Sequence, residues 1–438
     1  MAITLVGAFE EVERMKNLRD IEEMERAEKA RKENESKLPH TSVTPVVFIE
    51  GSTKILISIQ IPIMQLPQQQ QPTPKRPKQG EVETFLQGRM KLSVEIQRSR
   101  PENPRKARKP VKISDFDLVA VLGRGAFGKV LLVEEKSTHQ TFAIKALKKD
   151  HILQDDGVES AKLEKRIFQI ATEHPFLVNM HSSFQDENRL FFVMEYVRGG
   201  DLMGHIQQKK YFSLARTKFY ACEVLLALEF LHANRIIYRD LKLENILMCA
   251  DGHIKVADYG ICKENIDFGD KTRVCTPDYM APEILNGEKY GRAVDWWSFG
   301  ILIYVMLHGR YSYNGVIEKD ILKAIYNGKV DFPRKTQTEA DIADLLSGLL
   351  EKDPRRRLGG GRDDANEIKR HPYFAGIDWN TFMERRVPPP WRPEVKNDRD
   401  FSNFKAEFTE QAADLTPMNT VLKPSDQAKF NDFDFVAA

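Results

Sequence analysis

The chain has 438 residues, of which 41% are apolar and 30% are charged, enough for about three units at roughly 150 residues per domain. Its formal net charge of +2 excludes the strongly basic surface of a general nucleic-acid binder. The four cysteines show no C-x-x-C spacing, which argues against a disulfide framework and a zinc site. No apolar run reaches the roughly 18 residues of a membrane span, and the start of the chain does not resemble a signal peptide. We therefore expect no transmembrane segment, no nucleic-acid partner, and a location in the cytoplasm or nucleus, with attachment to a membrane surface as a further option.

Three segments precede the first glycine-rich motif. Residues 1–40 are densely charged, with apolar residues at every third position, and predict a helix that is either solvated or part of a coiled coil. Residues 41–67 carry isoleucines at every second position and predict a short β segment, either one hairpin or the remnant of a β-domain. Residues 68–115 are rich in proline and glutamine and then basic, which favours a linker over a docking surface for anionic lipid.

A glycine-rich loop follows at residues 122–130, which read L-G-R-G-A-F-G-K-V. A dinucleotide-binding loop of similar spacing opens a helix after its third glycine. Here Gly128 leads instead into Lys129-Val130-Leu131-Leu132-Val133, a run typical of a strand. The sequence therefore predicts a hairpin whose backbone amides lie over phosphates.

A lysine and a glutamate are predicted to meet next to this hairpin. Strands are expected over residues 116–150 and 176–197, and a helix over about 158–170. Lys145 lies in the strand region and Glu164 in the helix. An ammonium that binds phosphates needs an orienting anion, and we assign that role to Glu164, with Glu159 as the competing candidate.

The strongest signal is the segment Y-R-D-L-K-L-E-N at residues 238–245, followed by Asp258-Tyr259-Gly260 and then by Ala281-Pro282-Glu283. Asp240 is placed to accept a hydroxyl proton, with Lys242 beside it as a charge clamp on the transferred phosphoryl group. Asn245 and Asp258 supply oxygen ligands for Mg²⁺. The order and spacing of these motifs resemble those of a eukaryotic protein kinase.

Residues 113–438 resemble the AGC group of Ser/Thr kinases, and protein kinase C in particular. The resemblance rests on motifs such as V-M-E-Y at 193–196, G-G-D-L-M at 199–203 and A-V-D-W-W at 293–297. It implies an α+β, bilobal fold with a β-rich small lobe and a helical large lobe, formed by residues 116–374, and a C-terminal tail at 375–438. It also implies ATP and Mg²⁺ as cofactors. The ATP-binding residues it implies are Leu122, Gly123, Gly125, Gly128, Val130, Ala143, Lys145, Met194, Glu195, Val197 and Leu247.

The same resemblance implies the substrates and the regulation. Asp201 and Glu244 stand where relatives face basic peptide residues, so protein substrates with Arg or Lys near the Ser or Thr are expected. Thr416 resembles the phosphorylated turn residue of the tail. Phe430, Phe433 and Phe435 resemble the hydrophobic motif, with Asp434 where relatives carry a phosphate. This acid resembles the protein kinase C-related (protein kinase N, Rho-effector) subfamily. A Rho-type GTPase or an anionic lipid is a partner hypothesis for residues 1–112 only.

Two features depart from the family pattern. The activation loop, D-K-T-R-V-C-T-P at residues 270–277, is two residues shorter than usual, and Cys275 replaces a glycine. Thr272 keeps the four-residue offset from Thr276, so it is the predicted target of an upstream kinase, with Arg239 as the partner of its phosphate. Two alternatives stay open, a pseudokinase scaffold and a kinase-fold remnant from an imperfect gene model.

Overall fold

The computed structural model describes residues 46–50, 53–57, 111–125, 128–155, 157–172, 174–264, 277–312, 325, 340–416 and 421–436. The chain divides into two units, Met1–Pro104 and Arg105–Ala438. In the first unit, β1 (Val46–Glu50) and β2 (Thr53–Ile57) pair antiparallel, with Val46 opposite Ile57. The predicted helix of residues 1–40, the rest of the predicted β segment and the linker up to residue 110 lie outside the described residues.

The small lobe of the second unit is built on a six-stranded antiparallel sheet with the strand order β12-β6-β7-β5-β4-β3. Five of these strands follow one another along the chain, and the sixth comes from its far end. Their bounds are β3 (Phe116–Gly125), β4 (Gly128–Glu135), β5 (Thr141–Lys148), β6 (Met180–Gln185), β7 (Arg189–Glu195) and β12 (Phe435–Val436). Because β12 pairs with β6, the C-terminal tail is an integral part of the small lobe.

The helix α4 (Val158–Ala171) covers one face of this sheet, after the short α3 (Lys149–Gln154). Its buried residues recur at a spacing of three or four, which turns one stripe of the helix toward the core. They are Ala161, Glu164, Ile167, Phe168 and Ala171. Glu164 is the single charged member of this stripe, so the stripe that packs the helix also carries an acid into the interior.

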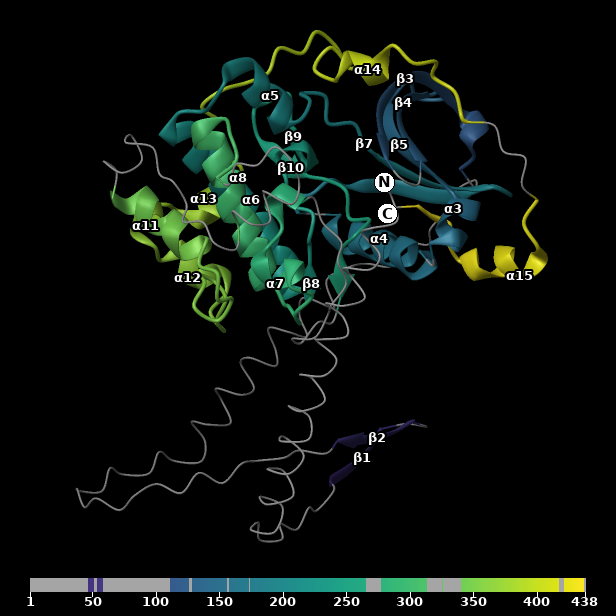
Figure 1. Cartoon of the computed structure of the whole chain (residues 1–438). Helices are drawn as coiled ribbons and strands as arrows, with labels where there is room; N and C mark the ends of the chain where they lie inside the picture. The colour runs from purple at the N-terminus through teal and green to yellow at the C-terminus, as the bar shows by residue number, and fades with distance from the viewer. Residues whose placement is uncertain are drawn as a thin grey trace, which may run out of the picture. The chain divides into compact units, whose positions relative to one another are not determined.

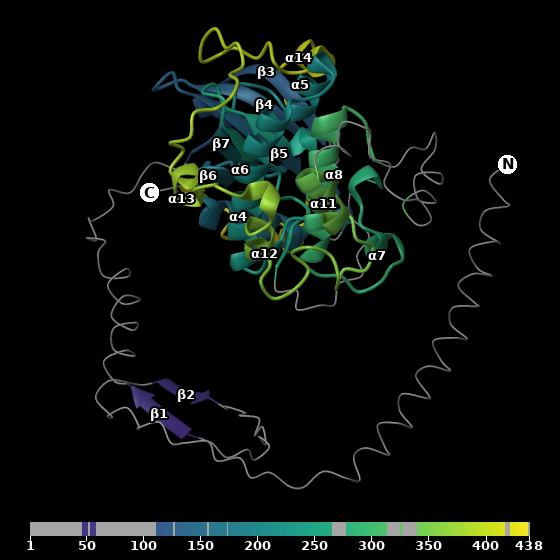
Figure 2. The ribbon, with the colours of Figure 1, turned by 90° about the vertical axis from the view of Figure 1, so that its left-hand side faces the viewer.

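Both faces of the sheet are covered, which is why its central strands are apolar almost throughout. One face joins a continuous core that runs through both lobes. The other face carries a smaller cluster that includes Phe116, Phe142 and Phe191, against which Phe408 and Leu415 of the tail pack. The tail helix α14 (Ala406–Thr409) lies against β3 in both views (Figures 1 and 2).

The large lobe is mainly helical and lies on the other side of the molecule (Figure 1). Its centre is formed by two helices that are buried on nearly every side. The helices of this lobe are α5 (Leu202–Lys209), α6 (Leu214–Ala233), α7 (Pro282–Leu285), α8 (Ala293–His308), α11 (Ala340–Leu349), α12 (Ala365–Lys369) and α13 (Trp379–Met383). The central pair is α6 and α8, with Trp296 and Trp297 fully buried. The predicted α+β, bilobal fold is thus confirmed.

Short elements complete the second unit. They are η1 (Ile113–Asp115), β8 (Ile236–Ile237), η2 (Leu243–Asn245), β9 (Ile246–Met248), β10 (Ile254–Val256), β11 (Lys263–Glu264), η3 (Pro277–Tyr279), η4 (Pro372–Phe374), α15 (Pro424–Gln427) and η5 (Ala428–Phe430). In the large lobe, Arg357 forms two bonds of 2.6 and 2.8 Å with the carboxylate of Glu283, and both side chains are buried. Among the residues that the structure describes, none of the helices is long and apolar enough to cross a membrane.

Candidate active site

The catalytic segment, residues 238–245, leads into strand β9 and ends with the short helix η2. Lys242 Nζ donates to both carboxylate oxygens of Asp240, at 2.9 and 2.8 Å. Asn245 Nδ2 donates to the same carboxylate at 2.7 Å and to the backbone carbonyl of Asp240 at 2.9 Å. The three residues predicted from the Y-R-D-L-K-L-E-N segment are therefore in direct contact, and Asp240 is held in one orientation.

The predicted lysine–glutamate pair forms the opposite wall. Lys145 Nζ lies 2.6 Å from Glu164 Oε1 and 2.8 Å from Asp258 Oδ1. Glu164 is buried, whereas about half of the Asp258 side chain is exposed. One ammonium therefore joins β5, α4 and the segment after β10. Glu159, the competing candidate, pairs with Lys162 on the surface instead.

The charges of this site follow from burial and pairing. Burial disfavours the charge of Lys145, but the carboxylates of Asp258 and Glu164 outweigh it and hold its pKa above the ordinary value. The Lys145 ammonium lowers the pKa of Asp258, so this carboxylate is ionised at neutral pH. Burial raises the pKa of Glu164, and Lys145 opposes that shift. Burial also raises the pKa of Asp240, which makes it a better proton acceptor.

The residues predicted to bind the adenine lie on β3, β4, β5 and β7 of the small lobe, directly after β7, and on β9. The sheet register places Ala143 opposite Met194, and Val130 opposite Lys145. Leu122, Ala143, Met194 and Val197 are buried, and Val130 and Leu247 pack against the same core. Gly125 and Gly128 pair directly, so the glycine-rich loop is a β-hairpin as predicted.

Glu195 takes part in this site through its backbone. Its side chain turns to Lys255, with Oε1 2.7 Å from Lys255 Nζ and 2.7 Å from the amide of Asn179. Residues 195–197, where β7 ends, are called the hinge below. The amide of Glu195 donates to the carbonyl of Asn179 at 3.0 Å, so its own carbonyl is the group we expect to face a nucleotide, which the sequence could not distinguish from a side-chain role.

The donor set fits the Mg²⁺ and ATP that the protein kinase fold implies. Hard divalent cations prefer oxygen ligands. Asp258 supplies an ionised, half-exposed carboxylate, and the hydrogen bonds of the Asn245 amide nitrogen leave its oxygen as the remaining ligand atom. These two residues would hold the metal.

A buried network behind the site was not predicted. Asp295 accepts hydrogen bonds of 2.8 Å from the amides of Tyr238 and Arg239, and so fixes the backbone that leads to Asp240. The ring of His232 is bonded through Nε2 to Asp295 at 2.8 Å and through Nδ1 to Asp364 at 3.1 Å. These two carboxylates outweigh the effect of burial and raise the pKa of His232 to about 9. A lone histidine at the end of an apolar helix gave no signal of this kind.

The two acids predicted to recognise a peptide lie next to the catalytic segment, Asp201 at the start of α5 and Glu244 on η2. Asp201 caps α5 by accepting from the amide of Gly204 at 2.7 Å, and it forms a bridge with Leu247 next to the catalytic segment. Oε2 of Glu244 is buried and has no hydrogen-bond partner within the described residues. Burial raises the pKa values of both carboxyl groups. A cation from outside the chain would satisfy Glu244.

The hydrophobic motif is seated on the small lobe. Phe430 and Phe433 are buried, and Phe433 meets Phe192 edge-on with ring centroids 5.2 Å apart. Phe435 lies in β12, opposite Ser183 of β6. Lys165 Nζ of α4 lies 5.7 Å from the centroid of Phe433 and 2.5 Å from the carbonyl of Asp432. The tail therefore contacts the same helix that carries Glu164.

Lys149, at the start of α3, joins the tail to the end of strand β6. The sequence did not predict this role. This lysine is 1% exposed, and its Nζ donates to Gln185 Oε1 at 2.7 Å and to Gln427 Oε1 at 2.8 Å. It also lies 5.2 Å from the ring centroid of Phe430. Burial lowers the pKa of Lys149, and the charge of Asp434 opposes that shift. Asp186 opposes it as well, so two acids, one of them in the tail, act on the charge of this buried lysine.

Thr416 lines a hollow of about 250 Å³ on the small lobe. Most of the charged side chains around it are basic: Arg124, Lys129, Lys148 and Arg189, with His151. The carbonyl of Thr416 accepts from Arg189, and Lys129 Nζ lies 2.8 Å from Asp414 Oδ1.

Thr272 lies outside the described residues, whereas Arg239, its predicted partner, donates to the carbonyl of Ile261 at 2.7 Å and to Tyr290 Oη at 2.8 Å.

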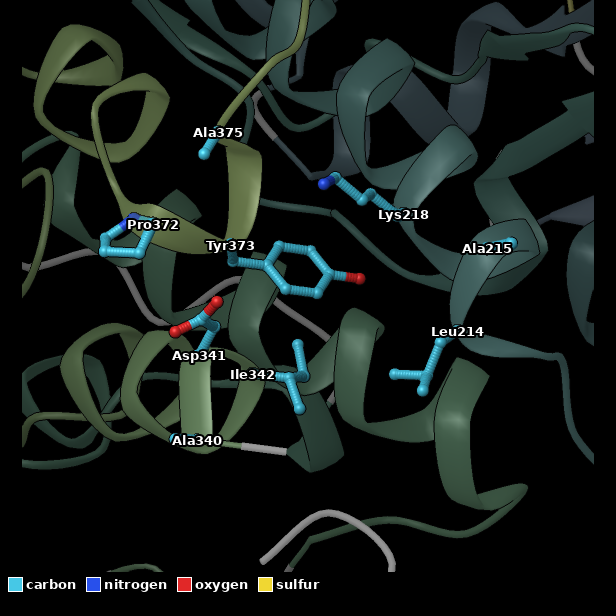
Figure 3. Close-up of a pocket in the computed structure, with 9 residues that line it drawn as sticks. All are labelled: Leu214, Ala215, Lys218, Ala340, Asp341, Ile342, Pro372, Tyr373 and Ala375. Carbon is cyan, nitrogen blue, oxygen red and sulfur yellow. The ribbon is translucent and has the colours of Figure 1, made fainter. Parts of the chain in front are cut away.

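A larger hollow of about 630 Å³ opens on the large lobe, between α6, α11 and η4 (Figure 3). Lys218, Asp341 and Tyr373 are the polar side chains at its rim. None of the predicted catalytic or ATP-binding residues lines it. The candidate active site is instead the cluster formed by Lys145, Glu164 and Asp258 together with Asp240 and Lys242.

Comparison with known proteins agrees with this geometry. The family model of the protein kinase domain matches residues 110–374, more than half of the chain, and that of the protein kinase C terminal domain matches residues 395–435. Protein kinase C of Aspergillus fumigatus is 48% identical over 352 residues, which are 80% of this chain and 31% of that protein. Protein kinase C of Drosophila melanogaster is 49% identical over 325 residues, 74% of this chain and 44% of that protein. Protein kinase C-like 1 of Saccharomyces cerevisiae is 47% identical over 333 residues, 75% of this chain and 29% of that protein.

The chain thus spans less than half the length of these relatives. The family assignment nevertheless rests on a match to most of the second unit. The contacts of Lys145 with Glu164 and Asp258, and of Lys242 with Asp240, agree with it. The chain belongs to the protein kinase family, with a kinase domain followed by a protein kinase C terminal domain.

Proposed function

We propose that this protein is a Ser/Thr kinase of the protein kinase C type, which transfers the ATP γ-phosphate to Ser or Thr in basic sequence contexts. The observation that carries this proposal is the single ammonium of Lys145 between Glu164 and Asp258. A pseudokinase would not need this arrangement to be complete. We therefore prefer the active enzyme over the scaffold.

The residues of the chain supply position and charge. Lys145 binds phosphate oxygens and is oriented by Glu164. Asp240 orients the substrate hydroxyl and accepts its proton, while Lys242 neutralises the negative charge that builds up on the transferred group. Bound Mg²⁺–ATP supplies the phosphoryl group and the charge that offsets its oxygens. Because the transition state is loose, these fixed charges account for most of the rate.

The preference for basic peptides is inferred from two acids beside the catalytic segment. Oε2 of Glu244 is buried without a partner in the described part of the chain, and burial, together with the charge of Asp201, raises the pKa of Glu244. A guanidinium or ammonium group of the substrate would relieve both. Protein substrates with Arg or Lys near the Ser or Thr are therefore proposed.

Regulation is proposed at two threonines. An upstream kinase would phosphorylate Thr272, whose phosphate would pair with Arg239, and Thr416 would carry a phosphate beside the basic hollow of the small lobe. Full activity of Thr272→Ala, or mass spectra of active protein with Thr272 unmodified, would refute the first of these.

The free thiols of Cys222, Cys249 and Cys262 are consistent with the cytoplasm or nucleus. A Rho-type GTPase or a lipid as partner of residues 1–112 stays a hypothesis.

The test is transfer of labelled phosphate from ATP to a peptide with a Ser flanked by arginines. Asp240→Asn should lower kcat by roughly 10²–10⁴-fold, because it removes the proton acceptor. Asp251→Asn is the matched control, since Asp251 pairs with Arg385 on the surface. Equal rates for wild type and Asp240→Asn, or no Mg²⁺-dependent transfer by wild type, would contradict the proposal.

A further inference from the structure

The segment of residues 198–201 joins the hinge to α5 and is held from two sides. The amide of Gly199 donates to the carbonyl of Met248, and the amide of Met248 donates to the carbonyl of Gly200, both at 2.8 Å. A Cβ on Gly199 would lie 2.8 Å from Pro393 Cγ of the tail. A Cβ on Gly200, whose φ is +73°, would lie 2.3 Å from the carbonyl oxygen of Asn403. Strand β9 and the tail thus enclose this backbone with no room for a side chain.

A histidine links this segment to a tail tryptophan. His205, in α5, has its Nε2 2.7 Å from the carbonyl oxygen of Gly199. Burial lowers the pKa of His205, so the neutral ring donates its Nε2–H to that carbonyl. The ring also contacts Trp391, which meets it edge-on at 67° with centroids 4.8 Å apart. The hydrogen bond that ties α5 to the Gly199 carbonyl therefore depends on where Trp391 holds the His205 ring.

A buried cation fixes Trp391 from the large lobe. The guanidinium carbon of Arg216, in α6, lies 4.3 Å from the centroid of Trp391 and 3.9 Å from that of Phe212. Arg216 is 9% exposed, and its Nε and Nη2 are buried without hydrogen-bond partners among the described residues. The Tyr220 ring, 5.5 Å away, is a third aromatic neighbour, and these rings stabilise the buried charge. Removing the indole would leave Arg216 with one ring fewer, so this contact resists displacement.

We infer that Trp391 is a positioning residue for the peptide substrate, acting through His205 and the Gly199 carbonyl on Asp201. This inference rests on the proposed function, in which Asp201 faces a basic residue of the substrate. Asp201 ends the segment of residues 198–201, and its carboxylate accepts from the amide of Gly204 in α5. The junction of this segment with α5, the helix that carries His205, therefore sets the position of the carboxylate. Asp240, by contrast, is oriented by Lys242 and Asn245. Trp391 thus sets the affinity for basic side chains and leaves the chemical step alone.

The experiment uses the full chain and two peptides, one with arginines around the Ser and one with alanines in their place. Trp391→Leu should raise KM for the basic peptide roughly tenfold, while kcat, the KM for ATP and kcat/KM for the neutral peptide change by less than about twofold. Trp391→Phe should retain most of the wild-type KM, because it keeps an aromatic face for Arg216 and His205. Trp379→Leu is the matched control, since Trp379 packs on Phe374 and Lys369 instead.

A double variant tests whether the effect passes through Asp201. Trp391→Leu should add little to the KM of Asp201→Asn, whereas independent roles would multiply the two effects. Equal losses on both peptides, a raised KM for ATP, or an unchanged KM for the basic peptide would overturn the inference. Thermal unfolding of each variant shows whether Trp391→Leu is folded; if it is not, His205→Phe, which keeps a ring against Trp391 but loses the hydrogen bond to the Gly199 carbonyl, should show the same rise in KM for the basic peptide alone.

Failure of the proposed function gives a different result. If wild type transfers no phosphate, the binding of fluorescently labelled basic and neutral peptides is measured by anisotropy on the same variants. A weaker basic-peptide complex in Trp391→Leu alone would support the positioning role without catalysis. Equal binding of both peptides by wild type, or equal binding by wild type and Trp391→Leu, would overturn it.

Discussion

Lys145 concentrates the chemistry of the site in one side chain. Its ammonium is the link between β5, α4 and Asp258, and its side chain is 17% exposed. The protein holds this charge in a place where burial alone would remove it, because two carboxylates stand within 2.8 Å. A neutral side chain of similar length would leave Glu164 as a buried acid without its cation.

The first prediction concerns this residue. Lys145→Met should lower kcat on the order of a hundredfold or more, because it removes fixed charge at the phosphates. Nucleotide affinity, measured by titration calorimetry, should fall less in Lys145→Met than in Asp258→Ala, since Asp258 would hold the metal. Lys162→Met, which removes a surface lysine of α4, is the control. Wild-type turnover in Lys145→Met would contradict the assignment.

The second prediction concerns His232 and pH. Its pKa of about 9 in the folded chain lies above the ordinary 6.5, so it stabilises the fold fully below pH 6.5 and loses this effect as pH rises through 9. The shift corresponds to a few kcal/mol, on the order of 3, in the free energy of unfolding. Urea unfolding at pH 7 and pH 9.5 should show that His232→Gln destabilises the protein more at pH 7 than at pH 9.5. A difference that does not change with pH would show that His232 is neutral in the folded state.

At the scale of elements, the sequence predicts what local pattern can encode. The glycine-rich hairpin, the helix around Glu164 and the segment at Asp240 could all be placed, because each has its own periodicity or spacing. The network of His232 with Asp295 and Asp364 could not, because its members lie on α6, on α8 and directly before α12, and the A-V-D-W-W motif around Asp295 does not indicate what its carboxylate contacts. Asp201 illustrates a third case, since a residue predicted to bind substrate also caps a helix.

The third prediction concerns the strand and turns that end the tail. Phe433→Ala should lower activity and stability together, because a buried ring against Phe192 is worth roughly 3–5 kcal/mol in compact cores and the tail supports α4. Asp434→Asn should do less harm, since it leaves Phe430 and Phe433 in place. Hydrogen exchange in α4 and β6, measured beside kcat, would show whether the tail has detached. Normal activity after deletion of residues 428–438 would refute a regulatory role of the tail.

At the scale of the whole molecule, the tail holds together parts that are far apart in the sequence. The hydroxyl of Tyr196 in the hinge donates to the carbonyl of Asp400 at 2.8 Å, and its ring stacks on Phe404. Lys129, next to the glycine-rich loop, pairs with Asp414. Neither contact was predictable, because an isolated lysine or aspartate in sequence is usually a solvated charge.

The fourth prediction follows from this pair. Asp414→Asn should raise the KM for ATP by roughly two- to fivefold and leave the KM for peptide unchanged, because the weakened contact lies beside the phosphate loop. Lys129 is nearly buried, so little water is at hand to replace that carboxylate as a partner of its ammonium. Asp426→Asn, which breaks an ion pair within the tail, is the control. Equal changes in the two KM values would place the effect elsewhere.

The sixth strand of the small-lobe sheet has a consequence for how the chain is made. Ser183 of β6 and Phe433 of the tail, joined by a hydrogen bond of 2.7 Å, are 250 positions apart. A ribosome needs about 12 to 50 s to add that many residues at roughly 5–20 residues per second. During this time β6 is an open edge of a five-stranded sheet, and the places of Phe430 and Phe433 are empty. Unpaired edges and exposed apolar surface are where nascent chains aggregate, so the small lobe is most vulnerable between its own synthesis and that of the tail.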